Sequence, residues 1–114
     1  MAKADEKKKK SVFSASGADE NGLGWGEIVV NGTTYRMRQL MVDESDSNWD
    51  AAFDDKTNKL NGRLHSRLNL SVSIVTPSTS IDDMGKWPTT KLVALLGAWD
   101  ELNVLPDADT EGNA

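Results

Sequence analysis

The residues of this chain that are best suited to chemistry are one histidine and two pairs of adjacent carboxylates. His65 is the only histidine, and Arg63 and Arg67 lie two positions to either side of it. A histidine base needs a nucleophile and an orienting carboxylate within hydrogen-bond distance, and no motif supplies them. We therefore interpret His65 as a surface or boundary residue. We expect that the protein has no catalytic residues and is not an enzyme.

The carboxylate pairs Asp54-Asp55 and Asp82-Asp83 offer oxygen ligands for a cation. A calcium loop requires oxygen ligands at alternate positions and glycine at the sixth. Counting from Asp54, however, the sixth position holds Lys59, so the pattern fails. Carboxylates near helix ends are more often capping or solvated groups. The chain also has no cysteine, which excludes disulfides and thiolate zinc sites. We expect neither a metal nor a cofactor.

Two further motifs concern anionic ligands. The segment Gly22-Leu23-Gly24-Trp25-Gly26 has the glycine content of a phosphate-binding loop, but such a loop follows a strand, whereas this one precedes a predicted strand. We interpret it as a flexible hinge. The lysine run at 7–10 lacks interleaved aromatic or arginine residues, and the net charge of −5 argues against nucleic acid as the principal partner. The run is interpreted as a solubilising arm or a tether for an acidic partner.

Charge and composition divide the 114 residues into three parts. Residues 1–24 contain few bulky apolar groups, and the first ten hold five lysines against two acids, so we predict a disordered basic arm. Residues 106–114 hold three acids and no base, which predicts an acidic mobile tail. Between them, residues 25–105 form one predicted domain. No apolar run approaches the roughly 18 residues that span a bilayer, so we expect no membrane partner.

The predicted domain is α+β, with an N-terminal β-hairpin packed on a small bundle of about three helices. Asn31-Gly32 tolerates the positive φ angles of a type I′ turn, and the residues after it alternate with period two. These signals predict a hairpin over residues 27–40. Because an isolated two-stranded ribbon is marginal in water, the hairpin must pack on helices.

Three helices are predicted, at about 43–54, 59–75 and 88–103. Asp43 or Ser47 is a candidate cap for the first. The second carries apolar residues at helical spacing and ends before Pro77. Pro88 suits the first position of the third helix. Between the last two, Ser80 with Asp83 resembles a helix start that is stopped almost at once by glycine.

Four tryptophans are a high share for a chain of this length. Their large amphipathic rings anchor protein interfaces as well as cores. Trp99 lies at the centre of the last predicted helix, which favours a core position. Trp87 lies at the entrance of that helix, where it could line a groove. For any single tryptophan we favour the core over a partner contact.

The order of these features has a counterpart in a known family. The hairpin segment EIVVNGTTYRMRQLMVDE leads into helices, Ser-Ile-Val-Thr-Pro follows at 73–77, and a leucine-rich helix begins after a proline at 88. Over about residues 26–105 this layout resembles the tail assembly chaperones of long-tailed, siphovirus-type bacteriophages. The short first helix and the proline at 106 depart from the family pattern.

The resemblance implies a protein-binding function without catalysis. It implies a chaperone in the host cytoplasm that binds the tape-measure protein, the tail tube protein or both during tail morphogenesis. Such a chaperone covers the apolar stripes of a long helical partner through a groove, and is displaced as the tube polymerises. For this function the predicted partner-binding residues are Trp87, Leu96 and Trp99.

Other functions stay open at this point. One is a structural virion protein, such as a head–tail connector or a minor tail component, whose charged arms order on assembly. Another is a small nucleic-acid-binding regulator that uses the lysine arm with Arg36 and Arg38. An enzyme ranks last. The sequence leaves the oligomeric state open.

Overall fold

The computed structural model describes residues 11–103, so residues 1–10 of the predicted basic arm and the predicted acidic tail lie outside the described residues. The described chain is mixed α+β, which confirms the predicted class. A four-stranded antiparallel sheet has the order β1-β2-β3-β6. Its strands are β1 (Ala15–Ala18), β2 (Gly24–Val30), β3 (Thr33–Arg38) and β6 (Ile74–Thr76).

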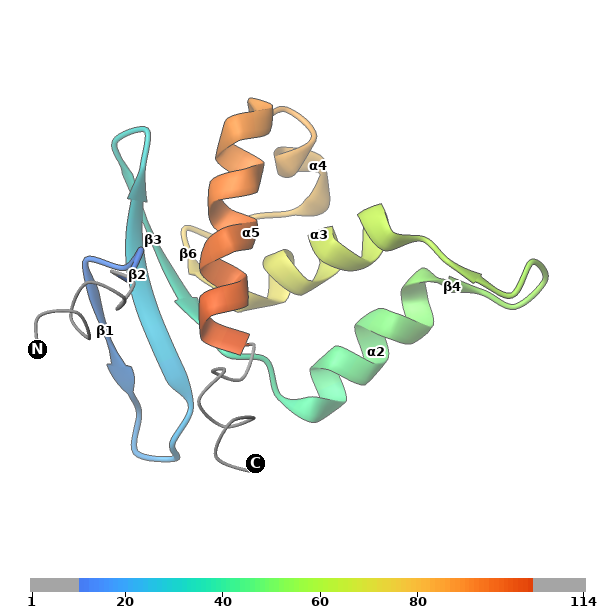
Figure 1. Cartoon of the computed structure of the whole chain (residues 1–114), viewed down its shortest axis with the longest axis horizontal. Helices are drawn as coiled ribbons and strands as arrows, with labels where there is room; N and C mark the ends of the chain where they lie inside the picture. The colour runs from blue at the N-terminus through green and yellow to red at the C-terminus, as the bar shows by residue number, and fades with distance from the viewer. Residues whose placement is uncertain (1–10, 104–114) are drawn as a thin grey trace, which may run out of the picture.

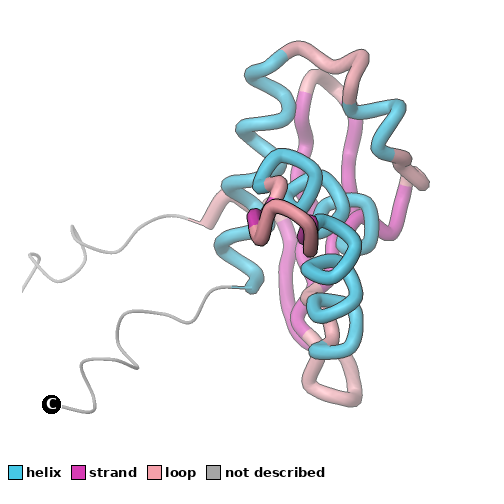
Figure 2. The backbone as a smooth tube through the Cα atoms, turned by 90° about the vertical axis from the view of Figure 1, so that its right-hand side faces the viewer, coloured by secondary structure: helices cyan, strands magenta, loops and turns pink. Residues whose placement is uncertain are grey.

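Helices lie on one side of this sheet (Figures 1 and 2). Helix α5 runs alongside the strands, while α3 leads away from them and α2 packs on α3 (Figure 1). A small second ribbon joins α2 to α3. The bounds of these elements are α2 (Val42–Ala52), β4 (Phe53–Asp54), β5 (Lys59–Leu60), α3 (Gly62–Ser73), α4 (Ile81–Met84) and α5 (Thr89–Asn103).

Strands β2 and β3 are joined by a two-residue turn. Val30 pairs with Thr33, and the residues between them, Asn31 and Gly32, have φ angles of 51° and 82°. Asparagine and glycine are the residues that adopt positive φ most readily, which explains the turn at this point. In β3 the buried side chains Tyr35 and Met37 alternate with more exposed ones, so one face of the strand meets the helices.

The predicted disordered arm is wrong over residues 11–24. Strand β1 pairs with β2, and Phe13 is buried in the core cluster. Asp19 Oδ1 accepts hydrogen bonds from the N–H groups of Asn21 and Leu23 and so closes the turn between the strands. The predicted glycine hinge is therefore part of a β-hairpin. All four residues of β1 are exposed. This segment has little apolar content, and it is held in place by the pairing of its backbone with β2 and by the burial of Phe13.

Helix α3 is shorter than the predicted helix at 59–75. It begins after Asn61, whose Oδ1 accepts a hydrogen bond from the N–H of Leu64, and residues 59–60 belong to β5 instead. At its other end the β-branched residues 74–76 leave the helix and form β6 beside β3. β-branched side chains lose rotamer freedom in a helix and pack well on a strand, which explains the early end.

The other helices differ from prediction at their ends. Helix α2 ends at Ala52, two residues early, and its N-cap is Met41 in place of Asp43 or Ser47. Helix α5 begins at Thr89, so Pro88 lies one position before the helix, and its carbonyl accepts hydrogen bonds from the N–H groups of Lys91 and Leu92. The start predicted at Ser80 is confirmed, because Ser80 and Asp83 exchange side-chain and backbone hydrogen bonds at the beginning of α4.

The core lies between the sheet and α3 and α5. Met37, Leu70 and Leu95, one from each of these elements, are completely buried. The end of α5 is tied to the β3–α2 connection, where Gln39 Nε2 donates to the carbonyl of Leu102 at 2.8 Å. Among the described helices, none has the length and apolar character needed to cross a membrane.

Gly26 provides a test of the packing of the N-terminal segment. A Cβ at this position would lie 2.6 Å from the ring of Phe13. Gly26→Ala should therefore displace the ring and lower the free energy of unfolding by about 1–3 kcal/mol in urea titrations. Gly97→Ala is the matched control: a Cβ there meets nothing within 4 Å. It should raise stability by up to about 1 kcal/mol because it removes a glycine from a helix interior. Equal stability of the two variants would contradict the docking of Phe13.

Candidate partner-binding site

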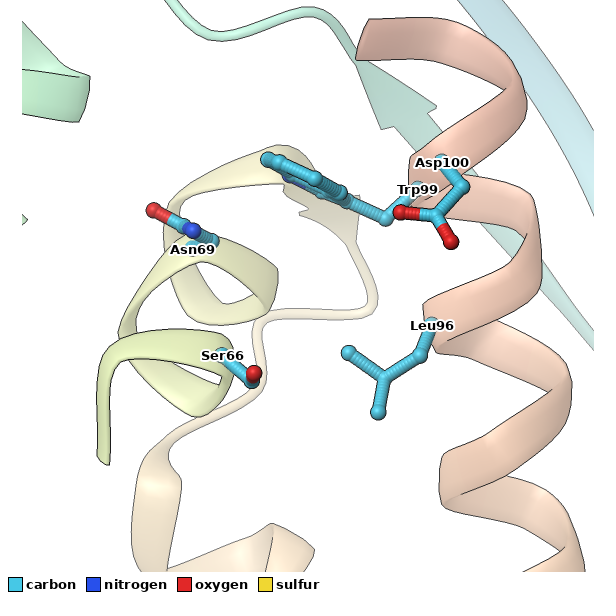
Figure 3. A pocket seen from close by; sticks show the side chains of 5 residues that line it. All are labelled: Ser66, Asn69, Leu96, Trp99 and Asp100. Carbon is cyan, nitrogen blue, oxygen red and sulfur yellow. The ribbon is translucent and has the colours of Figure 1, made fainter. Parts of the chain in front are cut away.

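A small hollow lies between α3 and α5. Its volume is about 180 Å³. Figure 3 shows the side chains that line it, two from α3 and three from α5. They are Ser66, Asn69, Leu96, Trp99 and Asp100. The lining thus combines two large apolar groups with three polar ones.

The helical repeat places Leu96 and Trp99 together. Residues three apart lie on neighbouring turns of one helix face. The adjacent residues Leu95 and Ala98 point into the core and are completely buried. Burial of this second pair holds α5 against the sheet, and it leaves Leu96 and Trp99 to face α3. Both are only partly buried, although they pack against the core cluster.

The indole N–H of Trp99 has no hydrogen-bond partner among residues 11–103. Its Nε1 atom is buried, and no acceptor among the described residues reaches it. An unpaired buried donor costs about 1–3 kcal/mol. The backbone carbonyl of Trp99 is satisfied, since it accepts a hydrogen bond from Asn103 Nδ2 at 3.0 Å.

The size of the hollow limits what it can hold. Sites for cofactors and other small molecules are usually about 300–1,000 Å³. A cavity of about 150 Å³ holds a single benzene ring. The hollow of about 180 Å³ is therefore suited to one side chain and too small for a cofactor. Among residues 11–103, no group of three acidic, histidine or cysteine side chains is arranged to bind a metal ion.

The structure separates Trp87 from the other two predicted partner-binding residues. Its ring packs edge-on against Tyr35, with 6.1 Å between ring centroids, and Lys91 Nζ lies 4.6 Å from the Trp87 ring centre. It therefore covers the sheet at the beginning of α5 and does not line the hollow. The candidate site contains Leu96 and Trp99, and it adds Ser66, Asn69 and Asp100, which sequence reasoning missed.

One of the polar residues that sequence reasoning missed, Asn69, could have been noticed from its position in the predicted helix. Asn69 lies within the apolar periodicity of α3, where asparagine has low helix propensity. In the fold it is buried, and its Oδ1 accepts a hydrogen bond from Asn48 Nδ2 of α2 at 2.9 Å. A polar residue at a core position of a predicted helix indicates such a partner, but the sequence does not say which residue provides it.

His65, Asp54 and Asp83, the residues with side chains suited to chemistry, each contact neighbouring residues of the fold. His65 packs edge-on against Trp49, with 5.4 Å between ring centroids. Asp54 Oδ1 accepts a hydrogen bond from the N–H of Lys56. Hydrogen bonds from the backbone N–H and hydroxyl of Ser80 lower the pKa of Asp83. Asp83 therefore belongs to the capping box at the start of α4, as a capping group would, whereas the hydrogen bond of Asp54 lies in the turn between β4 and β5.

The two arginines considered for nucleic-acid binding are both paired with acids. Arg36 forms an ion pair with Glu27 at 3.0 Å, and its guanidinium lies 4.0 Å from the centre of the Trp25 ring. Arg38 donates two hydrogen bonds to the carboxylate of Glu44, each of 2.8 Å. Neither guanidinium is left without an anion, which weakens the nucleic-acid hypothesis.

Comparison with known proteins identifies no relative. No protein-family model, curated protein or solved structure matches the chain. The case for a function therefore depends on the residues, their contacts and the layout of the sequence.

The Arg38–Glu44 pair connects β3 to α2 and makes stability depend on pH. Hydrogen bonds from the Arg38 guanidinium, together with one from the N–H of Met41, lower the pKa of Glu44 from 4.5 to about 2. Because the pKa of Glu44 is lower in the folded state than in the unfolded chain, the ionised carboxylate stabilises the fold at pH values above about 4.5. This contribution to stability is lost as pH falls from about 4.5 to about 2.

Glu44→Gln should remove this pH dependence. The amide can still accept the hydrogen bond from Met41, but it cannot pair with Arg38 as an anion. At pH 7 we expect a loss of about 1 kcal/mol, because the pair is partly solvated. The difference between wild type and variant should shrink as pH falls through the window, measured by urea unfolding at several pH values. Glu20→Gln, which removes an exposed carboxylate in the turn between β1 and β2, is the control. A difference that is the same at neutral and low pH would contradict the role assigned to the Arg38–Glu44 pair.

Proposed function

We propose that this protein is a phage tail assembly chaperone that binds the tape-measure protein, the tail tube protein or both. In this proposal one apolar side chain of a partner helix enters the hollow between α3 and α5. The observation that carries it is the pairing of Leu96 and Trp99 at an opening of one-side-chain size. The layout of the sequence, which resembles that of tail assembly chaperones, supports the choice of partner.

The chemistry of the hollow suits a helical partner. An amphipathic helix binds in a groove through apolar anchors at helical spacing. Leu96 and Trp99 supply the apolar contact, while the polar side chains of Ser66 and Asp100 line the same hollow. Hydrogen bonds from these polar groups can orient a partner without requiring a particular sequence. A chaperone that covers many turns of a long helical protein requires this tolerance.

The unpaired Trp99 indole N–H also supports the proposal. A partner that brings a carbonyl or hydroxyl oxygen to the indole N–H would satisfy this donor. The partner would then relieve a cost that the free protein carries. Tryptophan is among the residues most often found at the energetic centres of protein interfaces.

Leu96→Asp tests the proposal. The aspartate would place an unpaired charge against the partner and cost about 2 kcal/mol or more, which weakens binding roughly thirtyfold. The variant and wild type are co-expressed with the tape-measure and tube proteins encoded in the same genome. We expect the wild type to copurify with one of these proteins and to keep the tape-measure protein soluble, and we expect Leu96→Asp to do neither.

Two controls make the result specific. Val29→Asp introduces the same charge at an apolar sheet residue that is 55% exposed, and it should preserve binding. Thermal unfolding of all three proteins checks that they are folded. Mass spectrometry of purified particles then separates the chaperone from the structural virion protein, since only the latter is retained. Absence of any complex with tape-measure or tube protein would refute the proposed function.

A further inference from the structure

Helix α2 exposes an apolar strip that no described element covers. Val42 is 76% exposed and Trp49 is 47% exposed. They are seven residues apart, two turns of the helix, so they lie on one face. α3 is the only described element against which α2 packs extensively, and α2 lies on the outer side of the pair (Figure 1).

Contacts with two neighbouring rings hold the side chain of Trp49 in place. Its ring stacks on Phe53 with 6.5 Å between ring centroids and 14° between ring planes, and His65 packs edge-on against it. About 100° around the helix from Trp49, the buried hydrogen bond from Asn48 to Asn69 attaches α2 to α3. An aromatic ring that is already ordered loses little conformational entropy on binding, and is therefore a good anchor for a partner.

Acidic residues line this strip on one side. Helix α2 contains four acids and no base, and only Glu44 takes part in an ion pair among the described residues. At 100° per residue, Asp46 lies on the strip itself, and Asp43 and Asp50 lie along one edge of it. Asp50 is in the last turn, where the helix dipole disfavours an acid. Helix stability does not explain its presence.

We propose that the α2 surface, consisting of Val42, Asp46, Trp49 and Asp50, binds a basic amphipathic segment of another protein. Lysine or arginine side chains of this segment pair with the two aspartates, while an apolar residue packs on Trp49 and Val42. Charge selects this class of partner. The carboxylates repel nucleic acids and anionic membranes. A purely apolar helix would remove water from the two carboxylates without supplying a positive charge to pair with them.

This surface is separate from the hollow between α3 and α5. The hollow is lined by residues of those two helices, whereas the α2 surface belongs to α2 alone. The proposal therefore goes beyond the proposed function, and variants of each surface distinguish the two. Loss of binding at one surface should leave binding at the other intact.

The test uses a synthetic helical peptide of about 18 residues, with leucine at three- and four-residue spacing and lysine elsewhere. A second peptide carries glutamate in place of each lysine. Binding of the fluorescently labelled peptides to the full chain is measured by anisotropy at about 50 mM and about 300 mM salt. The lysine peptide should bind, and more weakly at the higher salt concentration. The glutamate peptide should not bind.

Variants then assign the binding to α2. Trp49→Ala should weaken binding of the lysine peptide at least about tenfold, the loss typical of an aromatic anchor. Asp46→Asn with Asp50→Asn should weaken it and reduce its salt dependence, and these exposed substitutions leave the fold intact. Glu20→Gln with Asp82→Asn is the matched control, because it changes the net charge equally at exposed residues outside α2. This control should bind as the wild type does.

Several results would overturn the inference. They are no binding of the lysine peptide up to about 1 mM, equal binding of both peptides, and unchanged binding by the Asp46/Asp50 double variant. Loss of binding in Leu96→Asp but not in Trp49→Ala would move the peptide to the hollow. If replacing Lys7, Lys8, Lys9 and Lys10 by serine strengthened peptide binding, the chain's own lysine run would be the occupant, which would overturn the assignment to another protein.

Discussion

The junction between α3 and β6 determines how the rest of the molecule is arranged. At this point the helix ends and the chain pairs with β3 as an edge strand, so one short segment belongs to both the helices and the sheet. Ser73 is completely buried, and its Oγ donates to the carbonyl of Arg38 at 2.6 Å. Because α3 is attached to the sheet in this way, its direction is set, and α2 and the hollow beside α5 take their positions from it.

Local chemistry made several elements predictable. The Asn31-Gly32 turn and the Ser80–Asp83 cap each depend on residues within a few positions of one another, and each occurs where expected. The end of α3 was harder to predict, because the apolar spacing of a helix continues into Ile74 and Val75. There the pairing with β3 decides the outcome, and a distant strand leaves no trace in the local pattern. Residues 11–24 were wrongly assigned for the same reason, since Phe13 is buried only once β1 pairs with β2.

The candidate site was predictable to the extent that it lies on one helix. Leu96 and Trp99 share a face of α5 because they are three residues apart, which the sequence alone reveals. Trp87 precedes that helix, and its contact with Tyr35 arises from packing between elements. Ser66 and Asn69 come from another helix, so their place in the hollow depends on how α3 approaches α5.

Asn69 connects the hollow between α3 and α5 to the α2 surface. It lines the hollow, and it also accepts the buried hydrogen bond from Asn48 that attaches α2. Apolar contacts alone would hold α2 against α3 without defining its rotation or register, whereas an amide pair has directional donors and acceptors. The buried pair therefore determines which face of α2 points outward. The exposed position of Trp49 is in this sense a consequence of a polar contact made by the neighbouring residue of the same helix.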